Sequence, residues 1–262
     1  MALPSRALIG VVHLPPLPGS PRSAMTVDAI VDRATDQARH LVDAGFDGVV
    51  IENFGDYPFF GERVEVHTAV AVGLVARAVV QAVDRPVGVN MLRNDARSGM
   101  AVAAMSGASF IRVNVHTGVY ATDQGVLEGK AAETMRYRSA LGVSVAVFAD
   151  VHVKHAKPLA GTAHHDLARA AEETAYRGMA DALIVTGPTT ARPAELEDVK
   201  RVKQAVPDRP VFVGSGVTAE TVAAVLAEAD GVIVGSALKQ GGQTEADLDA
   251  DRVKAFVQAA RG

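Results

Sequence analysis

The sequence contains no cysteine, and this absence removes several kinds of chemistry. A chain without thiols forms no disulfide, offers no thiolate to a metal ion and has no cysteine nucleophile. The chain also has no excess of positive charge, since 26 basic residues stand against 30 acidic ones. A nucleic-acid partner needs a basic surface that neutralises phosphates, so we do not expect one here.

Long apolar segments are missing as well. The apolar run at residues 7–14 is too short to cross a bilayer, and the residues before it do not resemble a signal peptide. The stretch 68–83 is interrupted by Arg77 and Gln81, so it indicates a buried helix. We therefore expect a cytoplasmic protein with no transmembrane segment.

The sequence does contain a regular alternation of strands and helices. Short runs rich in β-branched residues occur at 7–13, 48–52, 87–90, 110–114, 144–151, 182–185, 211–214 and 231–234. Alanine-rich segments with helical periodicity lie between most of them, including 27–44, 64–81, 194–205 and 218–228. Successive strand ends average about 32 residues apart. Because such units pair their strands in parallel, residues 1–262 are predicted to form a single (β/α)8 TIM barrel of the α/β class.

The alternative architecture is an open, doubly wound sheet. That fold would need a Gly-x-Gly-x-x-Gly turn after its first strand. Here residues 13–19 read His-Leu-Pro-Pro-Leu-Pro-Gly, and the prolines make this segment stiff and extended. It cannot form the amide cradle of a dinucleotide site, so the barrel is favoured.

Polar residues gather where the predicted strands end, and active sites of TIM barrels lie at those ends. Glu52 and Asp150 each end a buried apolar strand, where a carboxylate needs a partner. We predict that these two residues and His13 are catalytic. The predicted substrate-binding residues are Asn53, Asn90, Arg93, Asn114, His116, His152, Lys154 and Thr186. Some of these side chains could instead cap helices or bind loop amides. For Asn94 and Asp95, just ahead of the helical stretch 96–105, helix capping is the favoured role.

The last two predicted strands both run into the dipeptide Gly-Ser. Glycine lets a backbone approach an anion closely, and these two loops form the usual phosphate site of the barrel. The predicted phosphate-binding residues are Gly187, Gly214, Ser215, Gly216, Gly235 and Ser236. The alternative is that the glycines only make tight turns.

No cofactor is indicated by the sequence. Asp150 and His152 supply metal-ligand types, yet no His-x-x-x-His or Glu-x-x-His pair lies on a predicted helix, so the sequence does not favour a metal site. A divalent ion stays an open alternative. Lys154 follows the apolar part of its strand, which favours anion binding over Schiff-base chemistry.

Six motifs, each at a strand end, carry a family resemblance: residues 10–21, 47–56, 88–95, 110–118, 148–155 and 213–218. Together they resemble the BtpA/SgcQ family over nearly the whole chain. The resemblance implies a barrel of the ribulose-phosphate-binding type. One branch of that family is associated with photosystem I biogenesis, and others carry labels as nucleosidase, aldolase-like or phosphoribosylanthranilate isomerase-like proteins.

Two functions are consistent with these patterns. The first is an enzyme that acts on a small phosphorylated sugar or nucleoside-like substrate as an isomerase, lyase or C–N glycosidic hydrolase, with a long loop at 117–129 closing over the site. The second is a non-catalytic assembly or stability factor that uses residues 57–60, Tyr-Pro-Phe-Phe, as an exposed apolar patch. The helical segment 70–83 has little polar face, which predicts a homo-oligomer, a dimer or higher.

Overall fold

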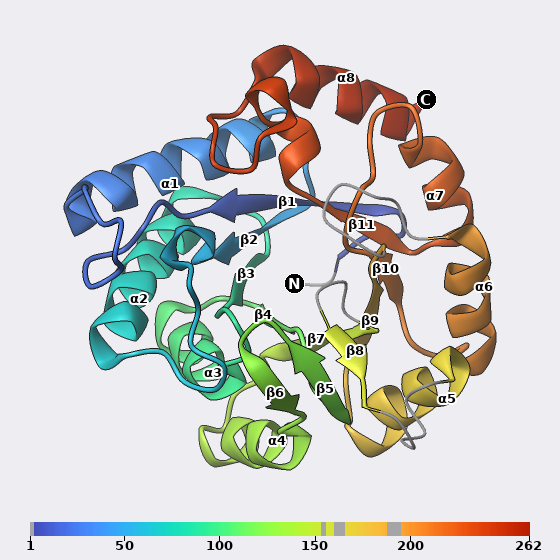
Figure 1. Ribbon diagram of the computed structural model, residues 1–262. Helices are drawn as coiled ribbons and strands as arrows, with labels where there is room; N and C mark the ends of the chain where they lie inside the picture. The colour runs from blue at the N-terminus through green and yellow to red at the C-terminus, as the bar shows by residue number, and fades with distance from the viewer. Residues whose placement is uncertain (1–2, 153–155, 160–165, 188–194) are drawn as a thin grey trace.

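The computed structural model describes residues 3–152, 156–159, 166–187 and 195–262. Its centre is a closed barrel of parallel strands in the order β1-β11-β10-β9-β7-β4-β3-β2 (Figure 1). The barrel strands are β1 (Ala7–His13), β2 (Gly48–Glu52), β3 (Val87–Asn90), β4 (Phe110–Val113), β7 (Ala146–Val151), β9 (Ala182–Val185), β10 (Val211–Val213) and β11 (Gly231–Val234). The predicted TIM barrel is confirmed.

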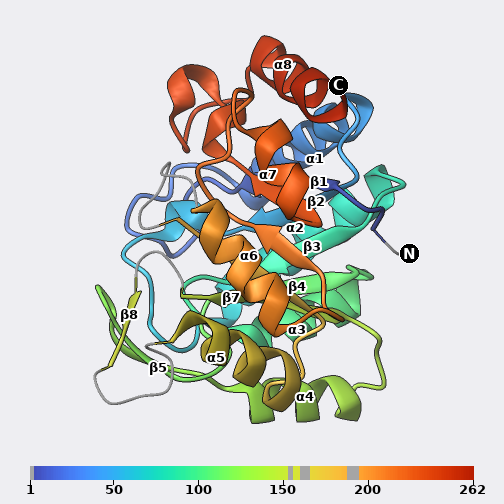
Figure 2. The ribbon, with the colours of Figure 1, turned by 90° about the vertical axis from the view of Figure 1, so that its right-hand side faces the viewer.

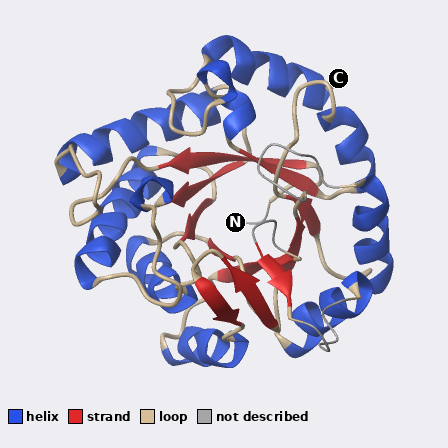
Figure 3. Ribbon diagram, viewed as in Figure 1, coloured by secondary structure: helices blue, strands red, loops and turns tan. Residues whose placement is uncertain are grey.

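Helices cover the outside of the barrel (Figures 1 and 3). They are α1 (Val27–Asp43), α2 (Val66–Ala82), α3 (Ala96–Ser106), α4 (Ala131–Ala140), α5 (Leu167–Glu172), α6 (Leu196–Ala205), α7 (Val222–Glu228) and α8 (Ala250–Arg261). A π-helical turn at Glu173–Arg177 extends α5, and short 3₁₀ helices lie at Phe54–Asp56, Ser236–Leu238 and Gln240–Gly242. Among the described residues, no helix is both long and apolar enough to cross a bilayer.

Two residues explain where α3 begins and how its start is held. Asp95 caps the helix as predicted, because its Oδ1 accepts a hydrogen bond from the amide of Ser98 at 2.9 Å. Asn94 does not act as a cap. Its side chain donates to the carbonyl of Val115 at 2.9 Å and accepts from the amide of Val115 at 2.8 Å. Asn94 therefore joins the ends of β3 and β4.

Phenylalanine rings fill the amino-terminal end of the barrel. The ring centroids of Phe110 and Phe148 lie 4.6 Å apart, and those of Phe148 and Phe212 lie 5.2 Å apart. Gly88 and Gly231 make room for these rings, since a Cβ atom on either glycine would overlap Phe110 or Phe212. This end of the barrel is packed with apolar side chains, so the polar groups lie at the carboxyl ends of the strands.

Residues 117–129 differ from the predicted loop. They form a hairpin of β5 (Val119–Thr122) and β6 (Gly125–Glu128), and β5 also pairs with β8 (Ala156–Pro158). Gly125 supplies the positive φ of +97° that the tight turn requires. The hairpin packs Leu127 against Val115 and Tyr120. Figure 2 shows this small sheet at the opposite end of the barrel from the amino terminus.

Candidate active site

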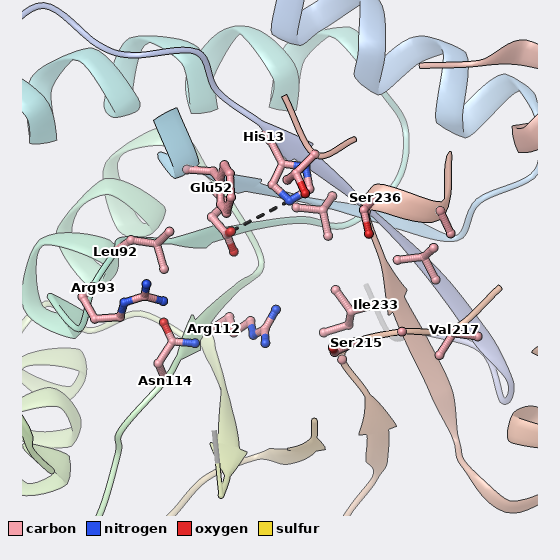
Figure 4. Close-up of a pocket in the computed structure, with 18 residues that line it drawn as sticks. His13, Glu52, Leu92, Arg93, Arg112, Asn114, Ser215, Val217, Ile233 and Ser236 are labelled. Carbon is pink, nitrogen blue, oxygen red and sulfur yellow. Dashed lines mark ion pairs between the residues drawn. The ribbon is translucent and has the colours of Figure 1, made fainter. Parts of the chain in front are cut away.

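A pocket opens at the carboxyl ends of the barrel strands (Figure 4). It contains many of the residues that the sequence predicted as a site: His13, Glu52, Arg93, Asn114, Gly214, Ser215, Gly216, Gly235 and Ser236. Arg112 and the apolar residues Phe54, Leu92, Val217 and Ile233 complete much of its wall. The pocket combines cationic, acidic and backbone groups in one cavity, which is typical of a binding site for a small polar ligand.

Strand register explains why His13, Glu52 and Asn90 lie side by side. His13 aligns with Glu52 across β1 and β2, and Glu52 aligns with Asn90 across β2 and β3. The side-chain amide of Asn90 donates to Oε2 of Glu52 at 2.6 Å. The other carboxylate oxygen, Oε1, lies 3.9 Å from Nε2 of His13. Asn90 thus fixes one oxygen of Glu52 while the other faces the imidazole and the pocket.

The His13 ring is held by packing on two sides. Phe54 meets it edge to face, with ring centroids 5.2 Å apart. On the other side lies Gly235, where a Cβ atom would overlap the imidazole ring. Gly235 was predicted to bind phosphate; what the structure shows is that its lack of a side chain makes the space that His13 occupies.

The carboxylate of Asp150 is bound by an arginine that the sequence analysis did not identify. Nε and Nη2 of Arg112 donate to Oδ1 and Oδ2 of Asp150, both at 3.0 Å, and Asn114 donates to Oδ2 at 2.8 Å. Burial lowers the pKa of Arg112, but the nearby charges of Asp150 and Glu52 outweigh that effect and leave the pKa raised. Asp150 does not line the pocket, so the structure brings Glu52 together with His13 rather than with Asp150.

Arg112 had a recognisable signal in the sequence. Phe110, Arg112 and Asn114 lie two positions apart along the chain, so alternation along a strand places all three on one face. Phe110 belongs to the barrel interior, which makes the arginine inward-facing as well. An arginine within an apolar strand needs an acidic partner, and Asp150 ends the neighbouring strand.

The two Gly-Ser loops form one side of the pocket. Gly216 has a φ of +69°, a value that favours glycine. Ser236 begins a 3₁₀ helix, and the amides at the start of such a helix have no acceptor within the helix. Ser215 is buried, with 6% of its surface exposed. These loops offer amides and hydroxyls suited to an anion.

Helix α7 begins later than predicted. The amide of Thr218 donates to Oγ1 of Thr221 at 3.0 Å, and these residues form a turn before the helix starts at Val222. The predicted start was residue 218. The loop backbone at 214–217, rather than the end of a helix, therefore faces the pocket.

Several predicted substrate-binding residues have structural contacts instead of a place in the pocket wall. Asn53 accepts a hydrogen bond from the amide of Leu92 at 2.7 Å. Nε2 of His116 lies 2.8 Å from the carbonyl oxygen of Gly178, and burial lowers the pKa of this imidazole. Thr186 donates to the carbonyl of His152 at 3.3 Å.

The pocket wall does not include His152, Thr186 or Gly187. Lys154 lies outside the described residues. Within the described ranges, no cluster of three or more histidine, aspartate or glutamate residues is arranged to hold a metal ion.

Comparisons with known proteins identify the family. The model of the BtpA family matches residues 4–262. The photosystem I biogenesis protein BtpA of Synechocystis sp. is 46% identical over 96% of this chain and 87% of its own length. A protein of Methanocaldococcus jannaschii is 42% identical over 97% of this chain and 95% of its own length.

Solved structures share the fold at low sequence identity. A structure titled native KDPGal has a TM-score of 0.58 and 22% identity, covering 97% of this chain and 94% of its own. The phosphoribosyl anthranilate isomerase of Thermus thermophilus has a TM-score of 0.56 and 13% identity, covering 97% of this chain and 98% of its own. These likenesses concern the barrel alone. The family match and the 46% identical relative show that this chain belongs to the BtpA family.

Proposed function

We propose that the protein is an enzyme that transfers protons on a small phosphorylated sugar, and that the reaction is an isomerisation next to a carbonyl group. The observation that carries this proposal is the placement of Glu52. Its carboxylate lines the pocket, is oriented by Asn90 at 2.6 Å and faces His13 at 3.9 Å. A carboxylate and an imidazole in one pocket are a suitable pair for general acid–base catalysis.

The phosphate of the substrate is placed at the Gly-Ser loops. The amides of residues 215–217 and 235–237, with the hydroxyls of Ser215 and Ser236, would bind its oxygens. Figure 4 shows both serines across the pocket from Glu52 and Arg93. A phosphosugar bound by this end extends its sugar carbons toward Glu52.

Each residue then has a distinct part in the reaction. Glu52 removes a proton from the carbon beside the carbonyl group and returns it to the neighbouring carbon. His13 transfers a proton between the two sugar oxygens. Arg112 donates a hydrogen bond from Nη1 to those oxygens, since Asp150 holds its Nε and Nη2 and Asn114 in turn holds Asp150.

The structural relatives support this class of substrate. The isomerase of Thermus thermophilus is named for a phosphoribosyl compound, and its barrel covers 97% of this chain. A barrel with Gly-Ser loops after its last two strands is suited to the same phosphate position.

A second candidate function comes from the relative that is 46% identical, which is named a photosystem I biogenesis protein. Under that alternative the protein acts by binding another protein. The predicted patch offers a surface for it, since Tyr57 is 37% exposed and Phe60 is 57% exposed.

A thermal-shift screen tests the phosphate site and separates the two functions. The wild type and Ser215→Asp would be heated with inorganic phosphate, ribose 5-phosphate, other sugar phosphates and nucleosides, each with and without Mg²⁺ or Zn²⁺. A ligand that binds the folded state raises Tm. We expect a sugar phosphate to raise Tm of the wild type and not of the variant, whose added carboxylate repels the phosphate. If no compound raises Tm of the wild type, the protein-binding function is favoured.

A further inference from the structure

Arg93 is a cation in the pocket whose role the proton-transfer mechanism does not explain. It follows β3, is half-buried and lines the cavity. In the part of the chain that the structure describes, Arg93 forms no ion pair. A partly buried guanidinium without a neutralising anion is costly to keep in a protein. The pocket therefore holds a positive charge that is available to a ligand.

The surroundings of Arg93 hold its guanidinium in one place. Its Cζ lies 4.7 Å from the centroid of the Phe59 ring, so the cation is stacked on an aromatic face. Nε donates to Oε1 of Gln124 in the β5–β6 turn at 3.2 Å. These contacts involve the ring face and Nε, which leaves the two Nη groups for a ligand. A guanidinium positioned in this way is preorganised to bind an anion through two parallel hydrogen bonds.

Arg112, the other arginine of the pocket, does not share this property. Asp150 binds it through two hydrogen bonds of 3.0 Å, so its charge is already neutralised. The pKa of Arg93 is lowered mainly by burial, against the opposing influence of Glu52, Asp123 and Asp150. None of these three carboxylates forms an ion pair with Arg93 among the described residues, whereas Asp150 contacts Arg112 directly.

The position of Arg93 indicates which part of a ligand it would meet. Figure 4 shows Arg93 on the side of the pocket away from Ser215 and Ser236. A ligand with its phosphate at the Gly-Ser loops would present its opposite end to Arg93. Glu52 lies near that end, so a doubly charged phosphate there would meet more repulsion than a singly charged carboxylate.

We propose that the natural ligand carries a carboxylate at the end opposite its phosphate, and that Arg93 binds this carboxylate. The ligand is then a phosphorylated acid, such as a sugar acid phosphate or a phosphosugar with an acidic substituent. The inference rests on the proposed function for the phosphate end only.

Matched ligands test the proposal by isothermal titration calorimetry. 6-Phosphogluconate and sorbitol 6-phosphate have the same carbon chain. At the end opposite the phosphate, the first has a carboxylate and the second has an alcohol. We expect the wild type to bind 6-phosphogluconate about tenfold more tightly or better, the size of a charge-assisted hydrogen bond. Arg93→Gln removes that preference and leaves the affinity for sorbitol 6-phosphate within about twofold. Arg93→Lys keeps part of the preference.

A control variant and a fold check make the loss specific. Arg85 precedes β3 at the other end of the same strand and is 49% exposed. Arg85→Gln is expected to keep the preference unchanged. Circular dichroism and Tm establish that each variant is folded.

Two further ligands separate the possible outcomes. D-Gluconate carries the carboxylate alone, and its weak binding should be lost in Arg93→Gln even if the phosphate site fails. Fructose 1,6-bisphosphate carries a second phosphate in place of the carboxylate. If Arg93 makes the protein bind this compound more tightly than 6-phosphogluconate, the proposal that Arg93 binds a carboxylate is overturned. The proposal is also overturned if the preference survives Arg93→Gln, or if neither acid shows binding that depends on Arg93. If D-gluconate binds through Arg93 but neither sorbitol 6-phosphate nor 6-phosphogluconate binds, the result would count against the proposed function instead.

Discussion

Arg112 and Asp150 form a buried, bidentate ion pair inside the barrel, with both N–O distances at 3.0 Å. Only 6% of the Arg112 side chain and none of the Asp150 side chain is exposed. Removing one partner of such a pair leaves a buried charge uncompensated. We expect Asp150→Asn to lower the free energy of unfolding by about 3 to 5 kcal/mol.

Urea denaturation of the wild type and Asp150→Asn measures this loss. Asp84→Asn is the control, because Asp84 is 80% exposed and lies 3.9 Å from Arg85. It should leave the unfolding midpoint unchanged, as exposed pairs contribute little. Equal stability of the two variants would contradict the structural role given to Asp150.

Gly235 is expected to be required for activity through His13. A methyl group at residue 235 would overlap the imidazole, so Gly235→Ala should displace the ring and lower kcat/KM by tenfold or more, about 1.4 kcal/mol. Gly73→Ala is the matched control. Its added Cβ meets no atom closer than 4.0 Å, and alanine favours the helix, so Tm should rise slightly with activity unchanged. Activity of Gly235→Ala equal to that of the wild type would contradict this role.

Lys239 makes stability depend on pH in the alkaline range. The residue is 1% exposed and donates to Gln37 at 3.0 Å. Burial, aided by the charge of Arg33 and opposed by Asp247, lowers its pKa from 10.5 to about 8. Between these values the unfolded chain binds the proton and the folded protein does not, so the free energy of unfolding rises with pH.

Urea denaturation at pH 7 and pH 9.5 tests this dependence. The wild type should gain about 1 to 2 kcal/mol relative to Lys239→Met between the two pH values. The series stops at pH 9.5 because burial raises the pKa of Tyr120 from 10.0 to about 12, and that group makes the free energy of unfolding fall above pH 10. Parallel curves for the two proteins would show that Lys239 does not titrate in this range.

An apolar stripe on α2 supports the prediction of a homo-oligomer. Val66 is 81% exposed, Val70 57% and Leu74 54%, and the spacing of four residues places them on one face. We expect the wild type to exceed the 27.2 kDa of one chain in light scattering, and Val70→Glu with Leu74→Glu to reduce it to a monomer. Val126→Glu, at a residue 56% exposed on β6, is the control and should not change the mass. A monomeric wild type would contradict the prediction.

The barrel could be predicted closely because its strands are buried on both faces. Uninterrupted apolar runs such as 182–185 and 231–234 have the same bounds in the structure. The hairpin at 117–129 was harder to recognise. Its strands are only four residues long, and one partner of β5 comes from residues 156–158, more than thirty positions later.

The site was predictable in its location and less so in its pairings. Strand ends and Gly-Ser loops indicated the residues that line the pocket, and nine predicted residues do so: His13, Glu52, Arg93, Asn114, Gly214, Ser215, Gly216, Gly235 and Ser236. Which carboxylate binds which partner depends on the register between strands. The alternation in the sequence marks Arg112 as inward-facing, but the register that pairs it with Asp150 comes from the structure.

The most direct test of the proposed chemistry is whether hydrogen exchange at a carbon of the substrate depends on Glu52. The wild type and Glu52→Gln would be incubated in D2O with the sugar phosphate that raises Tm most, and deuterium entry at carbon would be followed by NMR. Glutamine keeps the shape and the hydrogen bond from Asn90 but cannot accept the proton, so the exchange rate should fall at least 100-fold while ligand binding persists. Exchange by Glu52→Gln at the rate of the wild type would contradict the account.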